Sequence, residues 1–316
     1  MTDKRIRTDV IIPVYKPDQR FEELLDRLLK QTYPVHRIII MNTEERYWDH
    51  ETYRDQFAAA RDRNTEILVF HLAKQDFDHG GTRHLGFTKS DAEVCICMTQ
   101  DAVPADKYVV EKLVEALYEE EKTAVSYGRQ LPASDCGVVE RRTREFNYPA
   151  DSRVKSAKDL ETLGIKTYFC SNVCAAYRRE IYLVLGGFTT RTIFNEDMIF
   201  AAGAVKAGYK IAYAAGARVI HSHNYTAMEQ LHRNFDLAVS QADHPEEFSG
   251  LSAEGEGLRL VADTAAWLLR SGRWYLLPDL VVKSGFKYAG YRLGKMYRRL
   301  PKKLILKLTM NRAYWE

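Results

Sequence analysis

Val94–Met98 reads VCICM, and the polar residues Thr99, Gln100 and Asp101 follow it directly. An unbroken apolar run of this length is typical of a strand buried on both faces of a parallel sheet. Three similar runs precede it: TDVIIPV at 8–14, RIIIM at 37–41 and EILVF at 66–70. Apolar residues recur at helical spacing between the first two runs. The sequence therefore predicts alternating strands and helices, an α/β fold that binds ligands at the carboxyl ends of its strands.

The pattern is looser after about residue 130. Residues 131–165 are polar with little periodicity, which predicts a long loop or flap. Farther on we expect a helix that follows Asn195–Asp197 and ends near Lys206, and two short strands near 210–213 and 218–220. From about residue 258 the pattern predicts two or three helices.

The charge is unevenly distributed. Arg270–Glu316 holds twelve Lys and Arg residues and two acids, a net charge of +10, whereas the whole chain has a net charge of +3. A basic tail on a body of net charge −7 predicts a phosphate-rich partner, either an anionic membrane or a nucleic acid.

The N-terminal segment MTDKRIRTDV has no apolar signal region, and no apolar run is long enough to span a membrane. The five cysteines include no CxxC pair, so free thiols in a reducing compartment are expected. We therefore expect a cytoplasmic protein.

Asp101 is the first candidate for chemistry. A carboxylate at the carboxyl end of a strand can hold Mg²⁺ or Mn²⁺ against a diphosphate, since hard cations take oxygen ligands. The structural alternative is that Asp101 caps a helix beginning near Pro104.

His79–Gly86 reads HGGTRHLG and is the second candidate. Paired glycines before a helix allow backbone amides to approach a phosphate, and Arg83 can pair with an anion. The alternative is a glycine turn with a surface arginine.

Two further pairs of polar residues lie later in the chain. Glu196 and Asp197 could supply a general base, or they could be first-turn acids that complement a helix dipole. His221 and His223 share one side of a continuing strand and could bind a divalent metal, or they could be structural.

Taken in order, these segments resemble family 2 of the inverting glycosyltransferases with the GT-A fold. Further signs are VIIPVY at 10–15, QTYP at 31–34 and GGF at 186–188. Within the family, HGGTR followed by TQDA is similar to a rhamnosyltransferase branch that uses dTDP-L-rhamnose to build bacterial surface polysaccharides. The resemblance implies a Rossmann-like mixed sheet flanked by helices over residues 1–255, with a basic helical region over 256–316.

The resemblance also implies roles for individual residues. Asp197 takes the position of the catalytic base, with Glu196 beside it, and Asp101 that of the metal ligand, assisted by His221 and His223. Mg²⁺ or Mn²⁺ is the expected cofactor. The residues expected to bind the nucleotide-sugar are Pro13, Val14, Tyr15, Asn42, Gly81, Thr82, Arg83, Thr99 and Gln100. Thr99 replaces the first acid of the Asp-x-Asp motif of the family, so the site has one charge fewer.

The tail interleaves aromatic and basic residues, as in helices that lie on a membrane surface. We expect it to dock on the inner face of the cell membrane and to present a lipid-linked glycan acceptor to the enzyme. No nucleic-acid recognition motif accompanies the basic residues, so nucleic acid is not expected as a partner. Two rival functions are a non-catalytic sugar-nucleotide or glycan-binding homologue and a nucleotidyltransferase.

Overall fold

The computed structural model describes residues 6–251 and 254–315 and divides the chain into two compact units. The first unit consists of residues 1–131, 148–190 and 196–221, and the second of 132–147, 191–195 and 222–316. The second unit therefore includes more of the chain than the helical region expected at 256–316. The predicted boundary after residue 255 stays a prediction.

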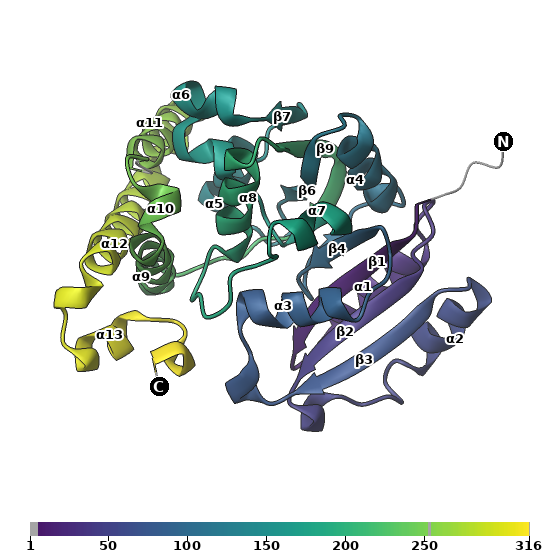
Figure 1. Ribbon diagram of the computed structural model, residues 1–316. Helices are drawn as coiled ribbons and strands as arrows, with labels where there is room; N and C mark the ends of the chain where they lie inside the picture. The colour runs from purple at the N-terminus through teal and green to yellow at the C-terminus, as the bar shows by residue number, and fades with distance from the viewer. Residues whose placement is uncertain (1–5, 252–253, 316) are drawn as a thin grey trace. The chain divides into compact units, whose positions relative to one another are not determined.

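The first unit is built on a nine-stranded mixed sheet, in the order β3-β2-β1-β4-β8-β6-β9-β5, with β7 paired to β9 (Figure 1). The strands are β1 (Thr8–Tyr15), β2 (Arg37–Thr43), β3 (Glu66–Leu72), β4 (Val94–Met98), β5 (Val103–Pro104), β6 (Thr123–Leu131), β7 (Arg153–Lys155), β8 (Cys174–Arg178) and β9 (Lys210–Ile220). The expected strands at 210–213 and 218–220 are a single strand, because β9 continues through a register shift against β6.

Strand direction brings the functional segments to one edge of this sheet. β1, β2, β3 and β4 are mutually parallel, and β9 is parallel to β6. β8 lies between β4 and β6 and is antiparallel to both. The carboxyl ends of β1, β4, β6 and β9 therefore share an edge with the amino end of β8.

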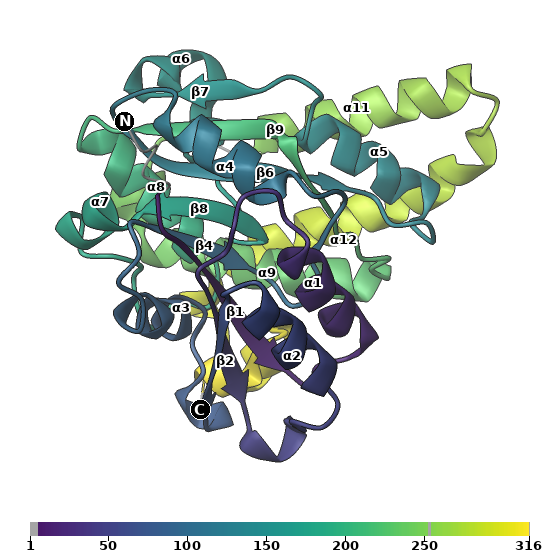
Figure 2. The same cartoon turned by 90° about the vertical axis from the view of Figure 1, so that its right-hand side faces the viewer.

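Helices cover both faces of the sheet (Figure 2). The helices of the first unit are α1 (Gln19–Leu29), α2 (Arg54–Asp62), α3 (His79–Thr88), α4 (Val109–Tyr118), α6 (Leu160–Leu163), α7 (Arg179–Val184) and α8 (Glu196–Lys206). On one face, α1 and α4 share the main hydrophobic core with Val10, Ile12 and Val14 of β1. On the other face, Phe87 of α3 stacks on Tyr182 of α7 with ring centroids 3.8 Å apart.

The second unit is helical and contains α5 (Val138–Asn147), α9 (Ala227–Asp243), α10 (Pro245–Phe248), α11 (Glu254–Arg270), α12 (Leu277–Lys295) and α13 (Lys302–Leu308). α9 and α12 pack closely because Gly290 and Gly294 face backbone. A Cβ added at these glycines would lie 2.1 Å from the Leu231 carbonyl oxygen and 2.3 Å from that of Phe235. The three helices after residue 254 agree with the predicted helical tail.

One prediction was wrong. Residues 131–165 are not a single long loop, since they form α5, β7 and α6. The helical periodicity of α5 is hard to see in the sequence because none of its side chains is fully buried.

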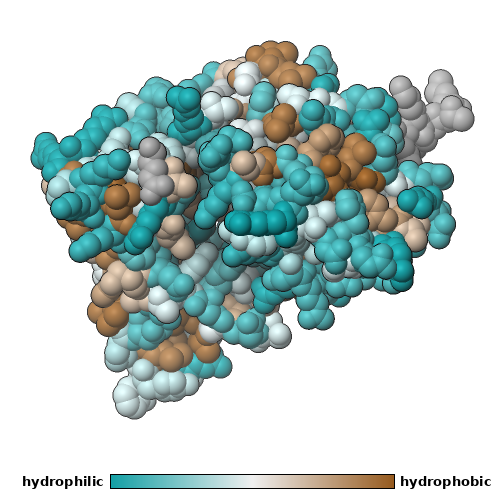
Figure 3. Space-filling model, turned by 90° about the horizontal axis from the view of Figure 1, so that it is seen from below, coloured by the Kyte–Doolittle hydropathy of each residue, from teal (hydrophilic) through white to brown (hydrophobic). Residues whose placement is uncertain are grey.

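Among the helices that the structure describes, none combines the length and the apolar character needed to cross a bilayer. On the face shown in Figure 3, hydrophobic side chains form separate patches on a mainly hydrophilic surface.

Candidate active site

Asp101 follows β4 and His221 follows β9, so strand direction brings both to the same edge of the sheet. Asp101 Oδ2 lies 3.5 Å from His221 Nε2, and the two side chains are 23% and 9% exposed. The helix after this segment begins at Val109, after the N-cap residue Tyr108. Asp101 is therefore not a helix cap, and the structural alternative for it is excluded.

Gln130 orients the imidazole of His221. Gln130 Nε2 donates to the hydroxyls of Tyr148 at 2.5 Å and Ser171 at 3.0 Å. Gln130 Oε1 is left to accept from His221 Nδ1, 2.9 Å away. A proton on Nδ1 leaves the lone pair of Nε2 directed at Asp101, which is the arrangement usual for a metal-binding histidine.

The donor set at this edge suits a divalent cation. A carboxylate and a neutral imidazole are both ligands of Mn²⁺, and a carboxylate is a ligand of Mg²⁺. The Thr99 hydroxyl is buried and has no hydrogen-bond partner among the residues described, so it can accept or donate a hydrogen bond to a ligand. His223 belongs to the second unit. Its role as a further ligand stays a prediction.

Glu196 and Asp197 form the first turn of α8 and differ in exposure. Glu196 is buried, whereas Asp197 is half-buried. Glu196 Oε1 lies 3.1 Å from Arg83 Nη1, and both side chains are less than a tenth exposed. Asp197 instead accepts backbone hydrogen bonds on both oxygens, from Asn172 at 2.9 Å and Met198 at 2.8 Å. Of the two carboxylates, Asp197 is the one that an acceptor hydroxyl can approach.

The environments of the two carboxylates move their pKa values apart. Burial and, after it, the negative charge of Glu196 raise the pKa of Asp197 to about 7. Burial alone would also raise the pKa of Glu196, but the guanidinium of Arg83 lowers it below its ordinary value. Glu196 therefore stays ionised while Asp197 titrates near neutrality, as expected of a general base.

Asn172 was missed by the sequence analysis. Its side-chain nitrogen donates to Glu196 Oε1 at 3.0 Å, and its oxygen accepts from the Tyr177 hydroxyl at 2.7 Å. The residue precedes β8, whose amino end reaches the site only because β8 is antiparallel to β4. The polar pair Ser171-Asn172 just before an apolar run was the available signal.

The glycine segment is a helix start rather than an open turn. Asp78 caps α3 and accepts from the Gly81 amide at 2.5 Å, and its own amide donates to the Thr82 hydroxyl at 3.2 Å. A Cβ at Gly80 would lie 2.0 Å from the Thr189 carbonyl oxygen, so glycine is required there by packing. Arg83 is buried rather than on the surface, which excludes the alternative of a surface arginine. Binding of the diphosphate by Gly81, Thr82 and Arg83 stays a prediction.

The end of β1 is tied to the segment after β4. Gln100 Oε1 accepts from the Tyr15 amide at 2.7 Å, and Gln100 Nε2 donates to the Tyr15 carbonyl at 3.2 Å. Val14 belongs to the hydrophobic core, whereas Pro13 is half-buried and Tyr15 is 36% exposed. Contact of these residues with a nucleotide stays a prediction.

Asn42 is the remaining residue expected at the nucleotide. It is completely buried at the end of β2, where its side-chain nitrogen lies 2.9 Å from His71 Nδ1. Its side-chain oxygen has no hydrogen-bond partner among the described residues. A buried acceptor without a partner is costly, so this oxygen is a candidate contact for a nucleobase.

Two curated relatives are similar to the chain over nearly its whole length. The O-antigen chain rhamnosyltransferase RfbN of Salmonella typhimurium is 37% identical over 314 residues, which cover 98% of this chain and 96% of the relative. The O-antigen chain rhamnosyltransferase WbaN of Salmonella anatum is 35% identical over 311 residues, which cover 97% and 95%.

Solved structures with the same fold are far more distant in sequence. The mannosyltransferase PcManGT of Pyrobaculum calidifontis, solved with GDP-Man and Mn²⁺, has a TM-score of 0.62 at 15% identity and covers 94% of this chain and 89% of its own. S. aureus TarS with UDP-GlcNAc has a TM-score of 0.51 at 17% identity and covers 93% and 92%. These structures support the fold of the chain.

The family described as Glycosyl transferase family 2 matches residues 9–186. This range runs from β1 to the turn directly after α7, and it includes Asp101 and Arg83. The match agrees with the resemblance noted in the sequence, and the mixed sheet flanked by helices agrees with the predicted fold. The chain therefore belongs to glycosyl transferase family 2 and is a glycosyltransferase.

Proposed function

We propose that this glycosyltransferase transfers L-rhamnose from dTDP-L-rhamnose, with inversion, onto a hydroxyl of a lipid-linked glycan during synthesis of a bacterial surface polysaccharide. The observation that carries the chemistry is the carboxylate pair at the start of α8. Glu196 is fixed in its ionised form by Arg83, and Asp197 remains open to an acceptor with its pKa raised to about 7. The choice of rhamnose is supported by similarity to two O-antigen chain rhamnosyltransferases.

Asp197 acts as the base in the proposed reaction. It takes the proton of the acceptor hydroxyl while that oxygen bonds to the anomeric carbon and the bond from this carbon to the diphosphate oxygen breaks. The amides of Asn172 and Met198 hold the carboxylate in place, so little reorganisation is needed during the transfer. Glu196 and Arg83 position Asp197 indirectly, because Asn172 bonds to both carboxylates.

Asp101 and His221 would hold a divalent cation, Mg²⁺ or Mn²⁺, with Gln130 fixing the imidazole tautomer. When bound, the cation supplies positive charge that stabilises the diphosphate leaving group. Thr99 contributes a hydroxyl in place of a second acid. We therefore expect metal affinity to be lower than in a site with two carboxylates.

The basic tail supports a position on the inner face of the cell membrane. Large apolar side chains are exposed in the segment that opens α12: Trp274 is 66% exposed, Tyr275 62% and Val281 65%. Arg273 precedes these side chains and Lys283 and Lys287 follow them, and a basic residue contributes roughly 1 kcal/mol on an anionic lipid surface. Such a surface would give the enzyme access to a glycan on a lipid carrier.

A thermal-shift panel tests the donor and the metal together. The panel contains dTDP, dTDP-rhamnose, UDP-GlcNAc and GDP-mannose, each with and without Mn²⁺. A ligand that binds only the folded state raises its stability, so dTDP compounds should raise Tm, and Mn²⁺ should increase the shift.

Asp101→Ala should remove the Mn²⁺ increment, whereas Asp62→Ala, an exposed acid at the end of α2, should keep it. A larger response to UDP- or GDP-sugars would reject dTDP-rhamnose as the donor. A response that is the same in Asp101→Ala would reject Asp101 as the metal ligand.

A further inference from the structure

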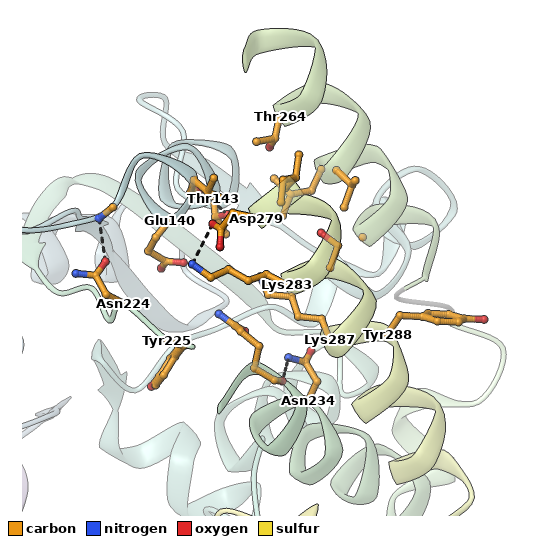
Figure 4. A pocket seen from close by; sticks show the side chains of 18 of the residues that line it. Glu140, Thr143, Asn224, Tyr225, Asn234, Thr264, Asp279, Lys283, Lys287 and Tyr288 are labelled. Carbon is orange, nitrogen blue, oxygen red and sulfur yellow. Dashed lines mark hydrogen bonds and ion pairs between the residues drawn. The ribbon is translucent and has the colours of Figure 1, made fainter. Parts of the chain in front are cut away.

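The second unit contains a cavity of about 530 Å³, and His223, a predicted metal ligand, is one of its lining residues. Its walls come from α5, α9, α11 and α12, and from the residues just before α9 (Figure 4). Most of the wall surface is apolar, and its aliphatic side chains include Leu237, Leu258, Leu260, Val261 and Leu280. The volume lies within the range of about 300–1,000 Å³ that is usual for small-molecule sites.

One basic side chain in this wall, that of Lys287, is paired with no acid that the structure describes. Glu140 pairs with Arg144 at 2.7 Å, and Asp279 pairs with Lys283 at 3.1 Å. Lys287, one turn after Lys283 on α12, makes no hydrogen bond or ion pair with any residue that the structure describes. Figure 4 shows Lys283, Lys287 and Asn234 at the same cavity as Glu140 and Thr143.

Lys287 is also half-buried. Burial lowers its pKa, and of the charged groups that face it Glu140 opposes this change, whereas Arg233, Arg144 and Lys283 add to it. A partly desolvated ammonium group near three other basic side chains favours the binding of an anion. The cavity therefore combines an apolar volume with a site for negative charge.

We propose that this cavity binds the end of a lipid phosphate, with the first part of an isoprenoid chain against the aliphatic wall and the phosphate or diphosphate at Lys287. The inference rests on the proposed function in one respect, that the acceptor glycan is carried by a lipid. A nucleotide fits the cavity less well than a lipid does, because most of the wall surface that its base would contact is apolar. A neutral lipid would leave Lys287 without a counter-ion.

Isothermal titration of the full chain tests the proposal, with farnesyl diphosphate, farnesol and inorganic pyrophosphate as probes. Excess dTDP and Mn²⁺ are present, so that binding of a diphosphate at the donor site does not contribute. Farnesyl diphosphate should bind more tightly than either farnesol or pyrophosphate, because only this probe fills the apolar volume and neutralises Lys287.

Two variants locate the binding. Lys287→Met should weaken binding of farnesyl diphosphate by about 10- to 100-fold, as expected when a charged hydrogen bond is lost. Ser284→Phe places a ring in the cavity and should weaken both farnesyl diphosphate and farnesol. Lys302→Met, which removes an exposed lysine of α13, is the matched control and should bind as the unmodified chain does.

Three results would overturn the proposal: no binding of farnesyl diphosphate, equal binding by Lys287→Met, or pyrophosphate binding as tightly as farnesyl diphosphate. The response to dTDP in the same preparation separates this failure from failure of the proposed function. A chain that binds dTDP but no farnesyl diphosphate keeps its transferase function and loses the lipid site.

Discussion

The two units differ in whether the charged side chains inside them have partners of opposite charge or hydrogen-bond partners. In the first unit, Glu196 is paired with Arg83, and both oxygens of Asp197 accept backbone hydrogen bonds. In the second unit, Lys287 is half-buried and is paired with no acid that the structure describes, because Glu140 and Asp279 are paired with other bases. A paired network holds a reacting group in place, whereas an unpaired cation in an apolar cavity favours the binding of an anion.

This difference has a measurable consequence for stability. Removing one member of a buried ion pair leaves an uncompensated charge and destabilises the fold. Removing a buried charge that has no partner relieves its desolvation and should stabilise it. Substitutions of Asp197, Arg83 and Lys287, and the pH dependence of the transfer rate, test this difference between the units.

Asp197→Asn should have the largest effect. The amide keeps the size and most hydrogen bonds of the carboxylate but cannot accept the proton of the acceptor hydroxyl. We expect the transfer rate to fall by about 10²- to 10⁴-fold, the usual contribution of a general base. The thermal shift with dTDP should remain unchanged. Glu180→Gln, at an exposed acid of α7, is the control. A variant that transfers sugar at the normal rate would exclude Asp197 as the base.

Arg83→Met should be the most destabilising of these changes. It leaves Glu196 ionised and buried without its partner, which costs about 3–5 kcal/mol of unfolding free energy. Urea unfolding measures this loss. Arg83→Lys should restore part of it, since an ammonium group keeps the charge without the planar geometry of arginine. A loss below about 1 kcal/mol, typical of an exposed pair, would show that the pair is not desolvated.

The transfer rate should depend on pH near neutrality. The raised pKa of Asp197, about 7, means that the base becomes protonated as pH falls through this value. Below it, the rate should fall about tenfold per pH unit, as for loss of a single ionised group. The profile of kcat/KM against pH measures this, because it reports the ionisation of the free enzyme. A rate that stays constant down to pH 5 would contradict the shift.

The Asp197 carboxyl also makes the stability of the fold depend on pH. Its pKa in the folded chain is raised above the ordinary value of 3.8. Its contribution to the unfolding free energy is therefore fully present below pH 3.8 and is lost as pH rises through about 7. Relative to the unmodified chain, Asp197→Asn should therefore gain stability as pH rises from about 4 to about 7.

Lys287→Met should have the smallest effect and the opposite sign to Arg83→Met. We expect the unfolding free energy to rise by roughly 1 kcal/mol in the absence of ligand, within the usual range for single substitutions. The same urea experiment measures it. Destabilisation of a size similar to that of Arg83→Met would mean that Lys287 has a partner within the fold and would remove the contrast between the units.

The sequence pattern located those candidate site residues that come directly after a predicted strand or at the start of a predicted helix. Asp101 and His221 follow strands that end at one edge, and Glu196 and Asp197 begin a helix after a polar segment, so local patterns locate them. Asn172 could not be found in this way, because its position depends on the antiparallel direction of β8.

The helical unit was less predictable because its contacts are long-range. The cavity draws its walls from helices as far apart in the sequence as α5 and α12, and no local pattern links them. α5 was expected to be part of a loop because its sequence, VVERRTREFN, is mostly polar. The basic character of the tail was evident from composition. The pairing that leaves Lys287 unbalanced depends on which acids and bases lie within reach of one another in three dimensions.

The anomeric configuration of the product tests the central claim most directly. The chain is incubated with dTDP-L-rhamnose, Mn²⁺ and a panel of polyisoprenyl diphosphate-linked sugars, and the new glycosidic bond is examined by NMR. We expect transfer of rhamnose with the configuration at the anomeric carbon opposite to that in the donor, and product formation about 10²- to 10⁴-fold slower with Asp197→Asn. A product that retains the configuration of the donor, or one formed equally well by Asp197→Asn, would contradict it.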